Sequence, residues 1–336
     1  MTRVVLMEDY LDHARTLDCV KELAERCELR IFTDKAKSEA ELASRLAGAQ
    51  IAITIRDRVM FTESVLSRLP DLKLLSVCGP RLDPHVDLPA ATRAGILVCR
   101  PQALDVPQVI HRATAELVWA LILGLARHTV QNDAHMRSGG WQSRIGFGLA
   151  GKTLGVIGLG RVGSPVAQMG VAMDMKVLAW SPRLTQERAS LWGAQAVSLQ
   201  ELLRQSHVVS LHANATAQSR SMIGREEFAM MRSDALFINT ARAAIVDEQA
   251  LREALDAGTI AGAGLDVFWG EPPPVDHWTR THEKVLLQPH MGGFTHEGYE
   301  WLLQPAVRNV LAYLDGKPTD IMNPELLPNV SRVTAP

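Results

Sequence analysis

The amino-acid sequence predicts an α/β protein built from two doubly wound parallel sheets. Short β-rich runs alternate with helical stretches along both halves of the chain, and the second half opens with a glycine-rich turn between a strand and a helix. With 336 residues, 47% of them hydrophobic, the chain is long enough for two domains that each bury a core.

The first series of strands occupies the first hundred residues. Its β-rich runs are separated by helical stretches such as Leu17–Arg26 and Glu41–Ala47. Because strands that alternate with helices pair in parallel, we expect one sheet with helices on both faces. The expected strands are Arg3–Met7, Leu29–Phe32, Gln50–Ile55, Leu72–Val77 and Gly95–Cys99.

A long apolar helix is expected next. Residues 113–127, ATAELVWALILGLAR, are apolar on nearly every side, which predicts burial inside a domain or in a subunit interface. The apolar run Leu117–Ala126 is shorter than the roughly 20 residues that span a bilayer, so we expect no membrane segment.

The second series of strands begins after a linker around Gly139 and Gly140. The stretch from Thr295 onward is helical and has no strands of its own, so we expect it to return and pack on the first domain. The strands expected in the second series are Thr153–Ile157, Lys176–Trp180, Val208–His212, Ala235–Thr240, Ala263–Val267 and Val285–Gln288.

Charge and cysteine content exclude several classes of partner. The chain has 35 Lys and Arg against 37 Asp and Glu and no strongly basic block, which argues against nucleic acid and membrane surfaces as partners. The first residues read as a strand rather than a signal peptide, so we expect a cytoplasmic protein. The cysteines lack the spacing of metal ligands, which predicts reduced thiols and no metal; they are Cys19, Cys27, Cys78 and Cys99.

A glycine-rich turn follows the first strand of the second series. Gly158, Gly160 and Gly163 form a G-x-G-x-x-G pattern directly after Thr153–Ile157 and before a helical stretch, Ser164–Met173. In such a turn the first glycine permits the bend, the second lets the backbone approach a pyrophosphate, and the third lets helix and strand pack closely. A purely structural turn is the alternative, but the strand before and the helix after favour a dinucleotide site.

The next strand, Lys176–Trp180, bears on the choice between NAD and NADP. A domain that prefers NAD usually places Asp or Glu at its end, where the carboxylate binds the ribose hydroxyls. Here Ser181 and Arg183 occupy this region, and both could accommodate a 2′-phosphate. The loop therefore favours NADP or does not distinguish between the two cofactors. The alternative is that Arg183 simply faces solvent.

Three polar residues follow later strands of this series: Arg242, Glu271 and His290. Ligands of doubly wound sheets bind at the carboxyl ends of strands, so we expect these side chains at one edge. An arginine can hold a carboxylate with two hydrogen bonds, a histidine can carry a proton near neutral pH, and a carboxylate beside it fixes its tautomer. Taken singly, each also fits an ordinary structural role, as a helix-entry charge, a loop acid or a strand-end histidine.

Four segments that contain these residues resemble, in order, the D-isomer-specific 2-hydroxyacid dehydrogenase family. They are WQSRIGFGLAGKTLGVIGLGRVG (141–163), INTARAAIVDEQAL (238–251), GAGLDVFWGEPPP (262–274) and LLQPHMGGFT (286–295). The resemblance implies a Rossmann cofactor domain, residues 104–293, inserted in a flavodoxin-like substrate domain formed by residues 1–103 and 294–336. It also implies a homodimer formed through the cofactor domains.

The same resemblance implies the reaction and the role of each residue. The chain would transfer a hydride between NAD or NADP and C2 of a small 2-keto or 2-hydroxy acid. His290 would be the acid/base, Glu271 its partner, and Arg242 the group that orients the substrate. Arg161 and Val162 would meet the pyrophosphate. The remaining cofactor contacts that the resemblance implies are His212, Thr240, Ala241, Asp266 and Gly292.

The sequence also departs from the family pattern. The substrate loop usually offers backbone N–H groups from a Gly-x-Gly turn, whereas Gly79, Pro80 and Arg81 stand here and introduce a cation. The residue after Arg242 is Ala243 rather than glycine. Because of the altered loop, glyoxylate, hydroxypyruvate, a phosphorylated acid and a bulkier keto acid all stay open as substrates.

A binding module is the competing hypothesis. Transcriptional corepressors that resemble these enzymes use the dinucleotide-bound fold to recruit peptides, but we expect no partner-docking extension in this chain. Formate dehydrogenases of the family carry glutamine where Glu271 stands here. The glutamate therefore favours hydroxyacid chemistry, in which an alkoxide must be protonated.

Overall fold

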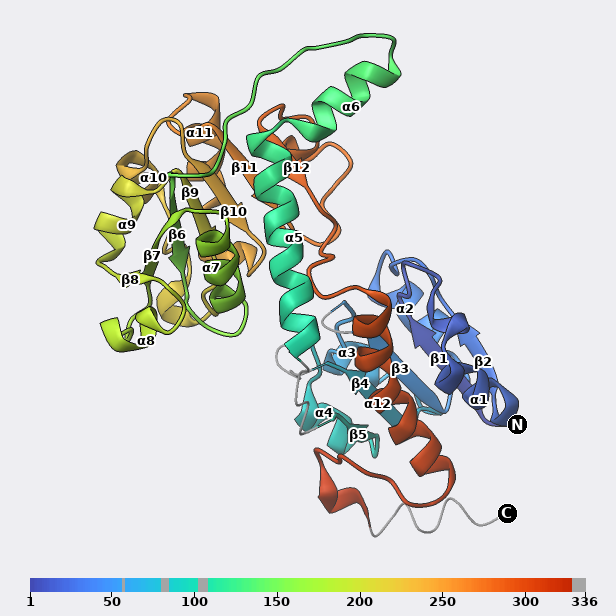
Figure 1. The fold of residues 1–336 in the computed structure, drawn as a ribbon. Helices are drawn as coiled ribbons and strands as arrows, with labels where there is room; N and C mark the ends of the chain where they lie inside the picture. Colours follow the sequence, from blue (N-terminus) through green and yellow to red (C-terminus); the bar gives the residue numbers. More distant parts are fainter. Residues whose placement is uncertain (56–57, 80–84, 102–107, 328–336) are drawn as a thin grey trace. The chain divides into compact units, whose positions relative to one another are not determined.

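The computed structural model describes residues 1–55, 58–79, 85–101 and 108–327 (Figure 1). The chain divides into two compact units, each with its own parallel sheet. We call them the first unit, Met1–Asp105 with His296–Pro336, and the second unit, Val106–Thr295.

The first unit holds a five-stranded parallel sheet in the order β2-β1-β3-β4-β5. This is the strand order of flavodoxin-like folds, which the family resemblance implies. The central strands β3 and β4 are buried along their whole length, which fits sequences that are apolar except for Thr54 and Ser76. The strands are β1 (Arg3–Met7), β2 (Glu28–Ile31), β3 (Ile51–Ile55), β4 (Leu74–Cys78) and β5 (Leu97–Cys99).

The helical tail of the chain completes this unit. Helix α12 packs on β4 and α1, and its backbone carbonyls accept hydrogen bonds from Ser76 Oγ and Cys78 Sγ of β4. Three of the other helices begin at a side-chain cap, Ser38, Thr62 or Asp87. The helices of the first unit are α1 (Asp18–Arg26), α2 (Glu39–Arg45), α3 (Glu63–Leu66), α4 (Leu88–Arg93) and α12 (His296–Leu314).

The second unit holds a seven-stranded parallel sheet in the order β12-β11-β10-β9-β6-β7-β8. The six strands β8-β7-β6-β9-β10-β11 lie in the order of a Rossmann sheet, and β12 extends the sheet at one edge. The prediction of two doubly wound sheets is therefore confirmed; only the two-residue strand β8 was not expected. The strands are β6 (Thr153–Ile157), β7 (Lys176–Trp180), β8 (Gln195–Ala196), β9 (Val208–Leu211), β10 (Leu236–Asn239), β11 (Gly262–Leu265) and β12 (Val285–Leu287).

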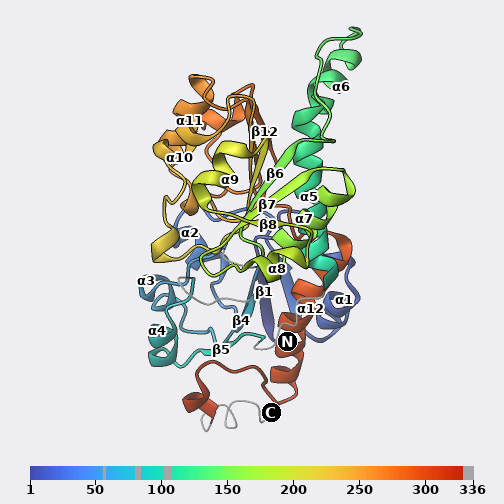
Figure 2. The same cartoon turned by 60° about the vertical axis from the view of Figure 1, so that its left-hand side comes forward.

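Helices cover both faces of this sheet (Figure 2). Helix α5 packs on β10, β11 and α7. Its Val118 and Ile122 are fully buried, while its Leu123 stays 38% exposed. The expected burial of this apolar helix is thus confirmed except along one edge. The helices are α5 (Gln108–Ala126), α6 (Thr129–Arg137), α7 (Gly163–Ala172), α8 (Gln186–Ser190), α9 (Leu199–Gln205), α10 (Arg225–Met230) and α11 (Glu248–Asp256).

The cysteines are free thiols, and all but Cys19 are buried. Burial raises the pKa of Cys27 to about 11 and that of Cys99 to about 12, so these thiols stay protonated at ordinary pH. Across the described ranges, no three His, Cys, Asp or Glu side chains gather into a group that could hold a metal ion. No helix in the described part of the chain is long and apolar enough to cross a membrane.

Candidate active site

The carboxyl edge of the seven-stranded sheet collects the predicted site residues of the second unit. Strand β6 lies between β9 and β7, so the winding of the chain reverses there, and ligands of doubly wound sheets bind at such a point. The turns after β6, β7, β9, β10, β11 and β12 carry Gly158, Ser181, His212, Thr240, Asp266 and His290, in that order.

The glycine-rich turn has room only for glycine at two of its positions. Gly158 has φ +99°, and a Cβ there would lie 2.7 Å from the backbone of His212 and Ala213. A Cβ at Gly163 would lie 2.1 Å from the carbonyl oxygen of Gly158, because α7 packs tightly on the turn. Both glycines are therefore required by the backbone itself.

The middle of the turn is open toward solvent. A Cβ at Gly160 would meet no atom within 4 Å, and Arg161 is exposed. Helix α7 begins at Gly163 without a side-chain cap. The N–H of Ser164 already donates to the carbonyl of Gly160 at 2.9 Å, so the donors that an anion could use are the N–H groups of the turn just before it. Open space in front of uncapped N–H donors fits a pyrophosphate. Val162 is half-buried and packs against the core, so its side chain also holds the turn in place.

The residue after β7 is tied to the same turn. Ser181 Oγ accepts a hydrogen bond from the backbone N–H of Leu159 at 3.0 Å. Its hydroxyl proton can still be donated to a ligand. Arg183 is exposed two residues later. No carboxylate stands at the end of this strand, so nothing there repels a 2′-phosphate.

His212, at the end of β9, lies against the glycine turn. Its backbone N–H donates to the carbonyl of Ile157 at 2.7 Å, and its Nε2 lies 2.8 Å from Ser210 Oγ. Desolvation lowers the pKa of His212 to about 3, so the ring is neutral at ordinary pH. A cofactor would therefore meet a neutral imidazole here rather than a positive charge.

A buried asparagine that we did not predict shapes the turn of Arg242. Asn239 is 1% exposed; its Oδ1 accepts from the N–H of Ala241 at 3.0 Å and its Nδ2 donates to the carbonyl of Arg242 at 3.2 Å. Arg242 Nη1 donates to the carbonyl of Ala241 at 2.7 Å. An asparagine that ends an apolar strand is a recognisable turn signal, since its amide bonds to nearby backbone groups.

Thr240, in the same turn, has a hydroxyl that fits a ligand. The residue is 9% exposed, and its Oγ1 has no hydrogen bond within the described part of the chain. Buried hydroxyls in proteins normally have a partner, so a polar group from outside the chain would satisfy this one. The neighbouring Ala241 is half-buried against the core.

His290 and Glu271 form a hydrogen-bonded pair. His290 Nδ1 lies 2.6 Å from Glu271 Oε2, with the side chains 19% and 37% exposed. The other carboxylate oxygen, Oε1, accepts from the N–H of Phe268 at 3.1 Å. His290 has φ +58°, an uncommon backbone conformation for a residue other than glycine. With Nδ1 bonded to the carboxylate, Nε2 is the ring nitrogen left to exchange a proton with a substrate.

Asp266 orders the backbone that follows His290. It is 1% exposed, and its two oxygens accept from the N–H groups of Met291 at 2.6 Å and Gly292 at 2.9 Å. A Cβ at Gly292 would lie 3.1 Å from Oδ2 of Asp266. The sequence did not reveal this contact, which joins β11 to the segment of the histidine. Asp266 therefore holds His290 indirectly.

The predicted substrate loop is described only at its first residue. Gly79 is buried after β4 with φ +149°, a conformation that favours glycine. Pro80 and Arg81 lie outside the described residues.

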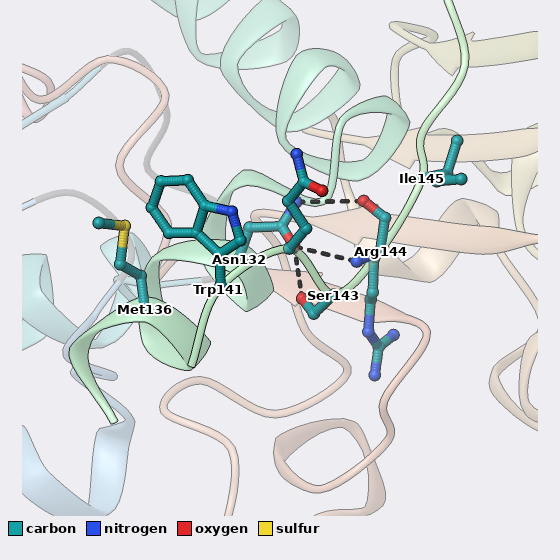
Figure 3. Close-up of a pocket in the computed structure, with 7 residues that line it drawn as sticks. Asn132, Met136, Trp141, Ser143, Arg144 and Ile145 are labelled. Atoms are coloured by element: carbon teal, nitrogen blue, oxygen red, sulfur yellow. Dashed lines mark hydrogen bonds between the residues drawn. The ribbon is translucent and has the colours of Figure 1, made fainter. Parts of the chain in front are cut away.

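Helix α6 and the segment after it form an arm that projects from the second unit (Figures 1 and 2). Asn132 holds the segment to the helix, because its Oδ1 accepts from Ser143 Oγ at 2.6 Å and from the N–H of Arg144 at 3.3 Å (Figure 3). Large apolar side chains lie exposed on this arm, and all but Val130 line a pocket there. They are Val130, Met136, Trp141 and Ile145.

Known proteins are similar to this chain over most of its length. Residues 119–292 match the family model for the NAD binding domain of D-isomer specific 2-hydroxyacid dehydrogenases. A glyoxylate reductase of Thermococcus litoralis is 34% identical over 320 residues, which cover 92% of this chain and 94% of that protein. A D-3-phosphoglycerate dehydrogenase of Methanocaldococcus jannaschii is 35% identical over 283 residues, 83% of this chain and 52% of that protein.

Solved structures show the same fold over nearly the whole chain. A phosphoglycerate oxidoreductase from Vibrio cholerae is similar with a TM-score of 0.86 and 30% identity, covering 94% of this chain and all of that one. An acyclic imino acid reductase in complex with NADPH and D-Arg is similar with a TM-score of 0.68 and 26% identity, covering 96% of this chain.

Proposed function

The chain belongs to the D-isomer-specific 2-hydroxyacid dehydrogenase family, and from this premise we propose that it interconverts a 2-keto acid and the D-2-hydroxy acid with His290 as acid/base. The observation that carries the proposal is the 2.6 Å contact between His290 Nδ1 and Glu271 Oε2. It joins an imidazole and a carboxylate from the ends of neighbouring strands, next to the strand that leads to Arg242.

The proton step belongs to His290. During reduction the protonated imidazole donates from Nε2 to the oxygen that develops negative charge at C2, and during oxidation neutral Nε2 takes the proton back. Glu271 keeps Nδ1 protonated and stabilises the imidazolium, since its negative charge lies at hydrogen-bond distance. Phe268 N–H holds the other oxygen of the same carboxylate in place.

Arg242 binds and orients the acid. Its guanidinium can pair with the substrate carboxylate and polarise the carbonyl that accepts the hydride. The turn that presents it is stiffened by Asn239, which accepts from the N–H of Ala241 and donates to the carbonyl of Arg242. We therefore assign Asn239 a supporting role for the arginine.

The residues around the glycine turn fit a nicotinamide dinucleotide, which when bound supplies or accepts the hydride. The open space at Gly160 and the uncapped start of α7 suit the pyrophosphate, with Arg161 beside it. The buried hydroxyl of Thr240 suits a polar group on the nicotinamide side. We propose the carboxamide as a further ligand of Asp266. Ser181 and Arg183, with no acid beside them, suit NADPH at least as well as NADH.

A panel of 2-keto acids tests the function. Turnover is measured by loss of reduced-nicotinamide absorbance, once with NADH and once with NADPH. The acids are glyoxylate, hydroxypyruvate, pyruvate, a phosphorylated acid and a bulkier keto acid. We expect turnover of at least one small acid, and the relatives named above make glyoxylate the first choice. No turnover of any acid with either cofactor, in protein that binds the dinucleotide, would contradict the proposal.

We also propose a homodimer formed through the cofactor domain, the second unit. Its arm exposes Trp141 and Ile145 to 71% and 97%, and exposed apolar groups of this size mark interaction surfaces. Light scattering should give twice the mass of the 36.9 kDa chain, and the double variant Trp141→Ser, Ile145→Ser should give a lower mass.

We further propose that the first unit is the substrate domain. The free cysteines fit a reducing compartment such as the cytoplasm.

A further inference from the structure

Two tryptophans stand on either side of Glu271 in the chain, and both indole N–H groups donate to one short segment. Trp269 Nε1 donates to the carbonyl oxygen of Val246 at 2.9 Å, and Trp278 Nε1 donates to Oε1 of Glu248 at 2.9 Å. The acceptors are two residues apart. The loop that carries the carboxylate is therefore fastened to this segment before and after Glu271.

The first acceptor belongs to the turn that begins at Arg242. Val246 is 1% exposed and ends that turn. The parallel bridge between Val246 and Ile223 uses the carbonyl of the preceding residue and the N–H of the following one, so it does not use the carbonyl of Val246. A buried carbonyl needs a donor, and the indole of Trp269 supplies it.

The second anchor is polar and lies at the start of α11. Oε1 of Glu248 accepts from Trp278 Nε1 and also lies 2.9 Å from Nε2 of His277. Arg280 closes the loop on itself by donating from Nε to the carbonyl of Pro274 at 2.8 Å. The loop is thus held at its far end as well as beside the carboxylate.

Trp269 is adjacent in the chain to the residue whose N–H holds the Glu271 carboxylate. The residue before Trp269 is Phe268, whose N–H donates to Oε1 of Glu271 at 3.1 Å. Oε2 of the same carboxylate faces His290 Nδ1. Movement of the indole therefore moves the donor that aims the carboxylate at the histidine.

We propose that Trp269 and Trp278 are positioning residues that clamp the Glu271 loop onto the Arg242 turn. The clamp keeps the Glu271 carboxylate at a fixed position relative to the Arg242 guanidinium. The inference rests on the proposed roles of Glu271 and Arg242. Because both anchors are side-chain donors, replacement of the indole by a phenyl ring removes each bond while keeping most of the packing.

Trp269→Phe is the first test, and Trp119→Phe is its matched control. Trp119 lies in the second unit too, is 3% exposed, and donates its indole N–H to a backbone carbonyl, that of Val166, at 3.3 Å. Trp269→Phe should lower kcat about ten- to a hundred-fold, since small misplacement of reacting groups costs rates of this order. It should change the dinucleotide dissociation constant little. Trp119→Phe should leave the pH profile of kcat as in the wild type.

Combination with Glu271→Gln separates the clamp from the function it serves. If Trp269 acts through the carboxylate, Trp269→Phe shifts the alkaline edge of the kcat profile in the wild type and adds no shift in the Glu271→Gln background. A shift with Glu271→Gln but none with Trp269→Phe would overturn the clamp alone. No effect of Glu271→Gln would instead overturn the role of the carboxylate.

The second anchor gives a test that does not depend on turnover. Glu248→Ala removes the acceptor of Trp278, whereas Glu248→Gln keeps a carbonyl oxygen that can accept the indole N–H. In cofactor-free protein, peptides covering residues 266–275 should exchange their amide hydrogens faster in Trp278→Phe and Glu248→Ala than in Glu248→Gln. Equal exchange in all these variants and in the wild type would overturn the proposal.

Discussion

His290 Nδ1 lies 2.6 Å from Oε2 of Glu271 across the ends of neighbouring strands. Replacement of His290 by Gln should leave the fold and dinucleotide binding nearly intact and lower kcat at least about 100-fold, the usual scale for a lost general acid/base. Steady-state kinetics and a fluorescence titration with NADH measure both quantities. Turnover near that of the wild type would remove His290 from the mechanism.

Glu271→Gln should move the alkaline edge of the pH profile for keto-acid reduction to lower pH. The amide keeps the shape of the side chain but withdraws the negative charge that stabilises the protonated imidazole. Reduction needs that proton, so activity is then lost at a lower pH. The profile of kcat between pH 5 and 10 measures the edge, and an unshifted edge would show that the carboxylate does not act on the histidine.

The loop after β7 should decide between the cofactors. Arg183→Ala should raise KM for NADPH about ten- to a hundred-fold and change KM for NADH little, because only the 2′-phosphate offers the guanidinium a charge-assisted bond. Ser181→Asp should also disfavour NADPH, by repulsion. Arg204→Ala, an exposed arginine of α9, serves as the control. If Arg183→Ala changed KM for NADPH and KM for NADH equally, the Arg183 side chain would face solvent rather than the cofactor.

Two alanine substitutions in the glycine turn should separate stability from cofactor binding. Gly163→Ala should destabilise the fold by about 1–3 kcal/mol, since its Cβ would overlap a backbone oxygen. Gly160→Ala should keep the wild-type Tm, because its Cβ meets no atom of the chain within 4 Å, but should weaken dinucleotide binding. Normal NADH affinity in Gly160→Ala would place the pyrophosphate elsewhere.

Histidines in the second unit should make the protein less stable in mild acid. Desolvation lowers the pKa of His111, His207 and His212 in the folded chain, to about 3 for His212. The unfolded chain then binds protons that the native state does not, so stability falls as pH drops below about 6.5. For His212 this loss continues toward pH 3, by up to about 1.4 kcal/mol per pH unit.

Urea unfolding at pH 8, 7, 6 and 5 tests this pH dependence. His212→Asn should have a shallower decline than the wild type, whatever its stability at pH 8. Parallel declines of the two proteins would show that His212 is protonated in the native state as readily as in the unfolded one.

Both sheets could be predicted from the amino-acid sequence. The strands Arg3–Met7, Thr153–Ile157 and Lys176–Trp180 have the predicted bounds, because unbroken apolar runs between turn residues leave a buried parallel strand little alternative. Only the two-residue strand β8, Gln195–Ala196, lacked a pattern that could reveal it. The candidate residues could also be found in the sequence, since doubly wound folds collect them where strands end.

The contacts that hold these residues in place could not be predicted, because they depend on how the chain folds. The bonds of Asp266 to Met291 and Gly292, and those of Trp269 and Trp278 to Val246 and Glu248, join residues that lie 23 to 30 positions apart. No local pattern encodes such contacts, because they arise only when neighbouring strands fix the distance between their turns. Local sequence could supply the imidazole and the carboxylate, but packing of the sheet set the 2.6 Å between them.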